Sequence, residues 1–277
     1  MATPSRQIQS VSTTELYNSW AKVYDTDNNI LQAIDDLLIP SLLTLGLKTA
    51  HSQLSHTSTS QSLTVTELGC GTGRNTAKLL LPPFTPSSQI PISTVNALDL
   101  SPAMLSIAQS RCSSIHSSTS PHNLSSIPQQ PTLTFHPFNA FSPSLNPAVP
   151  PLYGTADLVL STLVIEHLPL DVFFRTVRHL LKKEGGVLVL TNMHAEMGRR
   201  SQAGFMLEEG VKLQGESFVY EVEEVLEEGR RWGGTVVGEV GEREVRESDL
   251  ERRVVDRGRG GKWVGCKVWF GVVMRFD

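Results

Sequence analysis

The sequence predicts an α/β fold built around a mostly parallel sheet. Short runs rich in Val, Leu, Ile and Thr alternate with segments of helical periodicity, which is the pattern of βα units around such a sheet. The chain ends differently, because its last two strand-like segments are long and have no helix-length apolar pattern between them. Strands of this kind commonly pair antiparallel at the edge of a mixed sheet. A length of 277 residues fits one α/β domain with extensions or two small domains.

Two helices are predicted near the N-terminus, over residues 13–23 and residues 30–45, and the second is rich in Ile and Leu. The short strands are predicted at residues 63–68, 92–98, 132–135, 157–161 and 187–191. The long terminal strands are residues 235–245 and 262–276. The charge run at residues 221–231 is typical of a helix with a solvated face, and we expect Val222, Val225 and Leu226 to turn inward.

Low-complexity stretches interrupt these elements at about residues 49–62, 82–91 and 113–131. They are rich in Ser, Thr, Pro and Gln, and they are too polar to bury a core of their own. Each lies between periodic segments and not within one. The sequence therefore predicts that they are surface loop insertions.

Composition excludes several classes of protein. With 39% hydrophobic residues, 19% charged residues and a net charge of -4, the chain has the balance of an ordinary soluble globular protein, and nucleic acid is not expected as a partner. No run approaches the roughly 18 apolar residues of a membrane span, and the polar start gives no signal peptide. We therefore expect a cytoplasmic protein without a membrane partner. The scattered Cys70, Cys112 and Cys266 encode neither a disulfide framework nor a metal site.

A glycine-rich loop follows the first predicted short strand and precedes a helical pattern. Gly69, Gly71 and Gly73 are spaced two residues apart, so the backbone can turn tightly and approach a ligand closely. The dinucleotide pattern GxGxxG fails because Arg74 stands three residues after Gly71, and no P-loop is present. Glu67, two residues before the first glycine, would repel a pyrophosphate. The ligand is therefore expected to present a cationic or hydrogen-bond donor group here.

The run Glu67-Leu68-Gly69-Cys70-Gly71-Thr72-Gly73 resembles the ExGxGxG signature of class I S-adenosylmethionine (SAM) dependent methyltransferases. Asp99 ends the next strand, as the acidic residue that accepts hydrogen bonds from both ribose hydroxyls does in that family. The resemblance implies a Rossmann-like fold, with helices on both faces of a seven-stranded sheet and an antiparallel last strand. It also implies SAM as the cofactor, bound by Glu67, the three glycines and Asp99.

Three further residues are assigned to the cofactor through the same resemblance. Asn139 stands where many members have an Asp for the adenine amino group, and an amide oxygen can accept that hydrogen bond as well. Met104 either packs against adenine or belongs to the core. Tyr24 lies in a Tyr- and Trp-bearing segment that looks like the lid of many small-molecule members. The expected domains are a helical lid, residues 1–46, and a methyltransferase domain, residues 47–277.

Candidate catalytic histidines stand beyond two strand ends, where ligands bind in open α/β sheets. His167 follows Glu166 after the fourth strand and His194 follows the fifth, and either imidazole suits a general base for a hydroxyl acceptor. The glycine-punctuated segment 194–216 is expected to cover the substrate. The Pro-Pro motif of amino-methylating DNA enzymes is absent after the fourth strand.

A small organic methyl acceptor is therefore expected, with proteins as second choice, and the enzyme is expected to be a monomer or homodimer. The loop lengths suggest a fungal secondary-metabolite pathway. The alternatives are a SAM-fold protein that binds the cofactor without transferring its methyl group, and a nicotinamide oxidoreductase, which the failed GxGxxG pattern disfavours.

Overall fold

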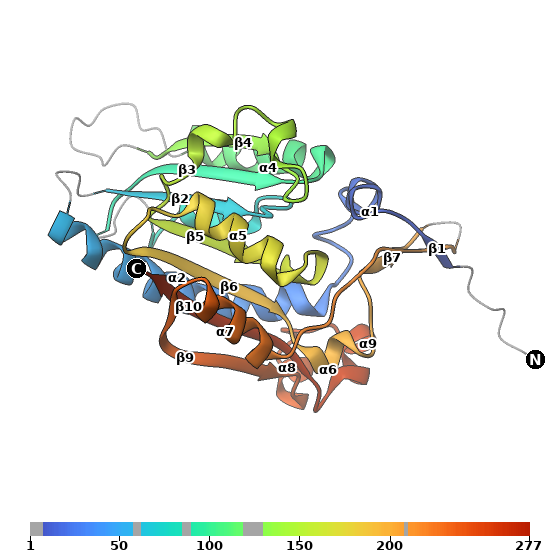
Figure 1. The fold of residues 1–277 in the computed structure, drawn as a ribbon. Coiled ribbons are helices and arrows are strands. Elements are labelled where there is room, and N and C mark those ends of the chain that lie inside the picture. Colours follow the sequence, from blue (N-terminus) through green and yellow to red (C-terminus); the bar gives the residue numbers. More distant parts are fainter. Residues whose placement is uncertain (1–7, 58–61, 85–89, 119–129, 208–209) are drawn as a thin grey trace, which may run out of the picture.

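The computed structural model describes residues 8–57, 62–84, 90–118, 130–207 and 210–277. Its centre is a seven-stranded sheet in the order β4-β3-β2-β5-β6-β10-β9 (Figure 1). The strands are β2 (Leu63–Leu68), β3 (Ile92–Asp99), β4 (Thr132–Pro137), β5 (Leu158–Thr162), β6 (Gly186–Met193), β9 (Gly234–Glu244) and β10 (Lys267–Phe276). Strand β10 runs antiparallel to both β6 and β9, and the other pairings are parallel. The predicted fold class, including the antiparallel last strand, is confirmed.

Hydrophobic layers cover both faces of the sheet, which explains the continuous apolar runs of its central strands. All eight residues of β6 are buried, and their side chains alternate between the faces. Leu188 and Leu190 pack with α5 (Leu170–Leu180) and α7 (Val222–Arg231), whereas Val187 and Val189 pack with α2 (Ile30–Thr57). On the β2 and β3 side of the sheet lie α3 (Arg74–Leu79) and α4 (Pro102–Ser118). The expected inward turn of α7 is observed, with Val225 and Leu226 buried.

Helix α2 is a core helix, which differs from two sequence-based expectations. It extends to Thr57, so the loop predicted from residue 49 is helical up to residue 57, and the boundary drawn after residue 46 falls inside the helix. The reason is an apolar stripe at helical spacing, Leu43, Leu47, Ala50 and Leu54, which is buried on the sheet beneath polar outer residues. Residues 58–61 lie outside the described part of the chain.

Part of α2, Ile30–Leu54, is long and apolar enough to cross a membrane by length and composition alone. Half of that stretch is buried inside the protein. Its packing on β6 and β10 accounts for the apolar composition.

The insertion predicted at residues 113–131 begins later than expected, whereas the described residues of the one predicted at 82–91 are turn or irregular structure. Helix α4 continues to Ser118, so the insertion predicted from residue 113 begins as helix, and residues 119–129 are outside the described part. In the insertion at residues 82–91, Phe84 is buried against the core cluster that includes α2, and residues 85–89 are not described.

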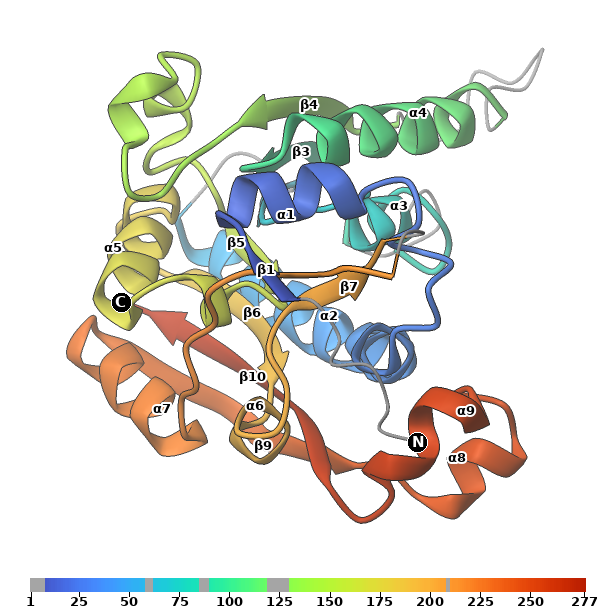
Figure 2. The same cartoon turned by 90° about the vertical axis from the view of Figure 1, so that its right-hand side faces the viewer.

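A cap covers the edge of the sheet at which the parallel strands end (Figure 2). We use this term for α1 (Thr13–Trp20) together with a small sheet of β1 (Ile8–Ser10), β8 (Lys212–Gln214) and β7 (Gly204–Met206). Leu16 and Trp20 of α1 pack on Phe205 and Leu213 of the small sheet. The N-terminal segment and the insertion that follows β6 therefore form one body, although about 190 residues of sequence separate them.

The remaining helices are short. They are α6 (Ala195–Gly198), α8 (Glu247–Glu251), α9 (Arg257–Gly260) and the 3-10 turns η1 (Pro143–Leu145), η2 (Pro150–Leu152), η3 (Ile165–His167) and η4 (Gly261–Trp263). Turns η1 and η2 lie between β4 and β5, η3 follows β5, and the others follow β6 or β9. Helices α8 and α9 occupy the connection between β9 and β10, where the sequence predicts no helix. Trp263, Val255 and Leu250 anchor this connection in a buried cluster with Met193 and Met197.

Candidate active site

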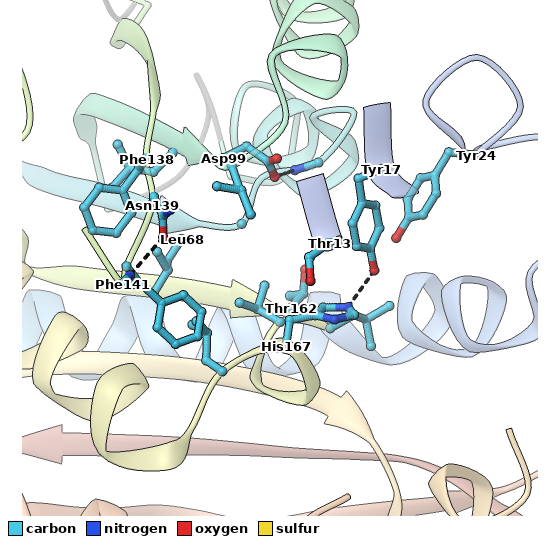
Figure 3. Close-up of a pocket in the computed structure, with 18 residues that line it drawn as sticks. Thr13, Tyr17, Tyr24, Leu68, Asp99, Phe138, Asn139, Phe141, Thr162 and His167 are labelled. Carbon is cyan, nitrogen blue, oxygen red and sulfur yellow. Dashed lines mark hydrogen bonds between the residues drawn. The ribbon is translucent and has the colours of Figure 1, made fainter. Parts of the chain in front are cut away.

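A cavity lies between the cap and the carboxyl ends of β2, β3, β4 and β5 (Figure 3). Its open space, including the solvent at its mouth, is about 780 Å³. The residues that follow each strand form its floor: Gly69 and Gly71 after β2, Asp99 at the end of β3, Asn139 after β4 and Leu163 after β5. Tyr17 and Tyr24 close it from the side of the cap.

The glycine loop adopts a backbone conformation that favours glycine. Gly69, Gly71 and Gly73 have φ angles of 77°, 54° and 77°. A Cβ on Gly69 would lie 2.2 Å from Val164 Cγ2, and one on Gly73 would lie 3.0 Å from the Cα of Ala108 in α4. No atom lies within 4 Å of the Cβ position of Gly71, whose bare backbone borders the cavity. Gly69 and Gly71 therefore line the cavity, whereas Gly73 lets α3 pack on α4.

Asp99 is held by the loop that it faces. Its Oδ2 accepts a hydrogen bond from the Gly71 N–H at 2.7 Å, and its Oδ1 accepts one from the Ser101 N–H at 2.8 Å. Desolvation in the wall raises the pKa of Asp99 to about 6, although the N–H donors of Ser101, Gly71 and Leu100 favour the charged form. The carboxylate and the bare backbone of Gly71 thus meet at one side of the cavity, as the sequence predicts.

Glu67 and Met104, which were also assigned to the cofactor, do not line this cavity. Glu67 is 1% exposed and accepts a hydrogen bond from the Thr76 hydroxyl of α3, and burial raises its pKa to about 8. This hydrogen bond connects β2, which precedes the glycine loop, to α3, which follows it. Met104 is buried in α4, in agreement with the core alternative.

The segment after β4 closes one end of the cavity with Phe138, Asn139 and Phe141. The Asn139 Oδ1 accepts a hydrogen bond from the Phe141 N–H at 2.9 Å, so the amide shapes this turn and retains one lone pair for another donor (Figure 3). Neither phenylalanine was singled out from the sequence. An aromatic residue on each side of Asn139 is a signal that could have identified them.

His167 and Tyr17 form a hydrogen-bonded pair in the wall of this cavity. The Tyr17 hydroxyl lies 2.7 Å from His167 Nε2, and Nδ1 lies 3.4 Å from the carbonyl oxygen of Glu216 (Figure 3). A carbonyl oxygen only accepts, so Nδ1 carries the proton and Nε2 accepts from Tyr17. Burial raises the pKa of the Tyr17 phenol well above its usual range, which keeps it protonated in this pair. Glu166 Oε1 lies 3.9 Å from Nε2.

His194, the other candidate general base, is placed differently and does not line this cavity. Its Nδ1 accepts a hydrogen bond from the Glu196 N–H as the N-cap of α6, and its Nε2 lies 3.1 Å from Glu242 Oε1. Both ring nitrogens are occupied, and the side chain lines none of the cavities described here. These contacts favour a helix-capping role for His194 over that of a general base.

A second cavity lies next to the first, and a wall of three residues separates the two. It shares Tyr17, Tyr24 and Leu163 with the first cavity, and its open space, including solvent, is about 1310 Å³. Its wall also contains Met193, Met197 and Trp263 from the layer around β10. The shared residue Leu163 has a φ of 59°, and a left-handed backbone at a branched apolar residue is a strain that proteins usually keep at functional sites.

Comparison with known proteins agrees with this geometry. A family model described as a methyltransferase domain matches residues 66–188. An uncharacterized methyltransferase of Emericella nidulans is 36% identical over 275 residues, which is 96% of this chain and 91% of that protein.

Solved structures share the fold. Magnesium protoporphyrin IX methyltransferase from Synechocystis PCC 6803 with bound S-adenosylhomocysteine (SAH) is 15% identical, with a TM-score of 0.50 over 95% of this chain and 97% of that one. The cyclase SpnF is 13% identical, with a TM-score of 0.55 over 98% of this chain and 99% of that one. At such identities the likeness shows the fold alone.

Proposed function

This chain belongs to the class I SAM-dependent methyltransferases, and from that premise we propose that it methylates a small organic acceptor bound in the second cavity. The observation that carries the proposal is the wall that both cavities share at Tyr17, Tyr24 and Leu163. A cofactor in the first cavity and an acceptor in the second would meet there. A concave site lined by several elements suits a small molecule better than a protein surface.

The residues of the first cavity fit SAM. The ribose hydroxyls can donate to Asp99, whose neighbour Gly71 leaves open space beside its backbone. Phe138 and Asn139 offer an apolar wall and a free lone pair for the adenine end. Glu67 supports the loop from behind through Thr76, and Tyr24 covers the cofactor from the cap.

When bound, SAM supplies a methyl group on a positively charged sulfur. The chain holds the acceptor in line with this methyl group, and such orientation can lower the activation barrier by roughly 7 to 11 kcal/mol. For a hydroxyl acceptor, Tyr17 takes the acceptor's proton on its oxygen and passes its own proton to His167 Nε2. Glu166, with Oε1 at 3.9 Å, stabilises the imidazolium that results.

The same proposal places the enzyme in the cytoplasm, as a monomer or homodimer without a nucleic-acid or membrane partner. The net charge of -4 supports the absence of a nucleic-acid partner. Secondary metabolism in a fungus is its proposed context, and the relative in Emericella nidulans supports the fungal part of this proposal.

The test is SAH release from SAM with a panel of hydroxylated acceptors, combined with calorimetry of SAM binding. His167→Gln and Tyr17→Phe should each lower turnover by about 10²-fold while SAM affinity stays within error. His51→Gln on α2, a histidine remote from both cavities, is the matched control and should behave as the wild type.

Normal turnover in both variants would exclude the proton relay and leave transfer by proximity. SAM binding with no methyl transfer to any small molecule would contradict the proposed function. That result would favour a protein acceptor or a SAM-fold protein that does not methylate.

A further inference from the structure

The second cavity also restricts the chemistry of the acceptor. We propose that it takes an amphipathic organic acid, with a carboxylate at Arg259 and Lys262, an apolar body against Met193, Met197 and Trp263, and a hydroxyl beside Glu166. This inference rests on the proposed function, because it assumes that the second cavity is the acceptor site. Each of the three parts of the acceptor follows from a different group of side chains.

The cations stand at the mouth of the cavity. Arg259 and Lys262 both line it and are exposed. The Arg259 guanidinium forms an ion pair with Asp27, whose Oδ2 lies 3.6 Å away and also accepts a hydrogen bond from Trp20 Nε1. Within the described part of the chain, no carboxylate lies within 4.0 Å of Lys262 Nζ, which rests over the Trp263 ring at 5.0 Å. Two positive charges at one opening, one of them without a paired carboxylate, favour an anionic ligand group.

One part of the cavity wall is apolar and adaptable, beside polar lining residues such as Asn29, Ser201 and Gln202. Met193, Met197 and Trp263 are each less than 10% exposed, and Ile30 and Leu31 of α2 join them in the wall. Methionine side chains adjust to irregular shapes and make favourable contacts with aromatic rings. The body of the acceptor should therefore be a ring system or a hydrocarbon chain, and its length separates the charged end from the reacting end.

Glu166 marks the reacting end. It is 5% exposed and lines the second cavity, while its neighbour His167 lines the first. Its Oε2 is buried and has no hydrogen-bond partner, although an unpaired buried carboxylate oxygen is costly. Before transfer, a hydroxyl on the acceptor can donate a hydrogen bond to this oxygen beside Tyr17, which also lines the second cavity and receives the proton during transfer. An acceptor without a hydrogen-bond donor at this end would leave Glu166 Oε2 buried and unpaired.

The experiment measures binding of matched compounds to the SAH-loaded protein. The probes are 4-hydroxycinnamate and longer hydroxylated aryl and alkyl carboxylates, each with its primary amide and its deoxy analogue. Binding is followed by tryptophan fluorescence, because Trp20 and Trp263 line the cavity. Acids should bind about ten-fold more tightly than their amides, and hydroxylated acids about ten-fold more tightly than deoxy acids.

Variants assign each preference to its residues. The double variant R259Q/K262Q should remove the preference for acids, and R252Q/R257Q is the matched control because both of its arginines are exposed in the same connection and do not line this cavity. Glu166→Leu should remove the preference for the hydroxyl without lowering the melting temperature, since it removes an unpaired buried charge. Calorimetry of SAM with each variant verifies that the cofactor site is intact.

Equal binding of acids and amides, or no saturable binding by any acid while SAH is bound, would overturn the inference. So would a preference for acids that survives in R259Q/K262Q. Methyl transfer to neutral acceptors alone would overturn the acid class and leave the proposed function standing. Failure of SAM itself to bind would instead contradict the proposed function.

Discussion

Replacing Asp99 by Ala tests the cofactor site most directly. The carboxylate accepts hydrogen bonds from Gly71 and Ser101, and its side toward the cavity is where two ribose hydroxyls would donate. Each hydrogen bond to a charged acceptor contributes about 1.5 to 3 kcal/mol. The loss of two therefore weakens SAM binding by about 3 to 6 kcal/mol, or roughly 10² to 10⁴-fold in Kd.

Titration calorimetry of SAM measures this change, and thermal unfolding verifies that the variant is folded. Asp171→Ala removes a carboxylate of the same kind from the exposed face of α5 and should leave the Kd unchanged. A Kd for Asp99→Ala within about three-fold of the wild type would refute the ribose assignment. A variant that fails to fold would be replaced by Asp99→Ser, which retains a polar group near the Gly71 N–H.

The raised pKa of Asp99 predicts that SAM affinity and protein stability both depend on pH. Because its pKa is about 6, the carboxylate loses its charge as the pH falls through 6, and SAM affinity should fall with it in the wild type but not in Asp99→Ala. The effect on stability has the opposite sign. A pKa raised above the usual 3.8 means that the native state favours the protonated form, so this contribution to the unfolding free energy is complete below pH 3.8 and is lost as the pH rises through 6.

Three further changes separate structural roles from functional ones. Gly73→Ala should lower the melting temperature, because φ is 77° and the new Cβ would lie 3.0 Å from the Cα of Ala108, and calorimetry should show a much smaller effect on SAM affinity than Asp99→Ala. Because the pKa of Glu67 is about 8, the wild type should lose unfolding free energy as the pH rises from 5 to 9 and the protonated form of Glu67 disappears. Glu67→Gln has no such proton to lose, so its unfolding free energy should rise relative to that of the wild type over this range. Urea titrations that show no such trend would contradict the raised pKa. His194→Ala should cost about 1 kcal/mol of stability through the lost helix cap while turnover stays normal, and a large fall in turnover would restore its catalytic role.

The cofactor side of the molecule could be predicted from the sequence because its signals are local. Strand β2, the glycine loop and α3 follow one another within 17 residues, and the positive φ angles of the loop are those for which glycine is the usual residue. The central strands β2, β5 and β6 agree with the prediction to within about two residues, since buried parallel strands are continuous apolar runs, whereas β10 begins five residues later than predicted. Helix α2 was predicted too short because the polar residues that follow residue 48 concealed an apolar stripe at Ala50 and Leu54.

The acceptor side could not be predicted in the same way, because it is assembled from contacts between distant segments. Tyr17 meets His167 across 150 positions of sequence, and β1 pairs with β8 across about 200. His167 and His194 stand at equivalent places after neighbouring strands, and only the partners of their ring nitrogens separate them. Arg259 and Lys262 lie in a connection that the sequence marks only by its charge. Under the proposed function, acceptor specificity depends on the cap and on the connection between β9 and β10. Changes in either would then alter the acceptor, while the glycine loop and Asp99 would continue to hold the same cofactor.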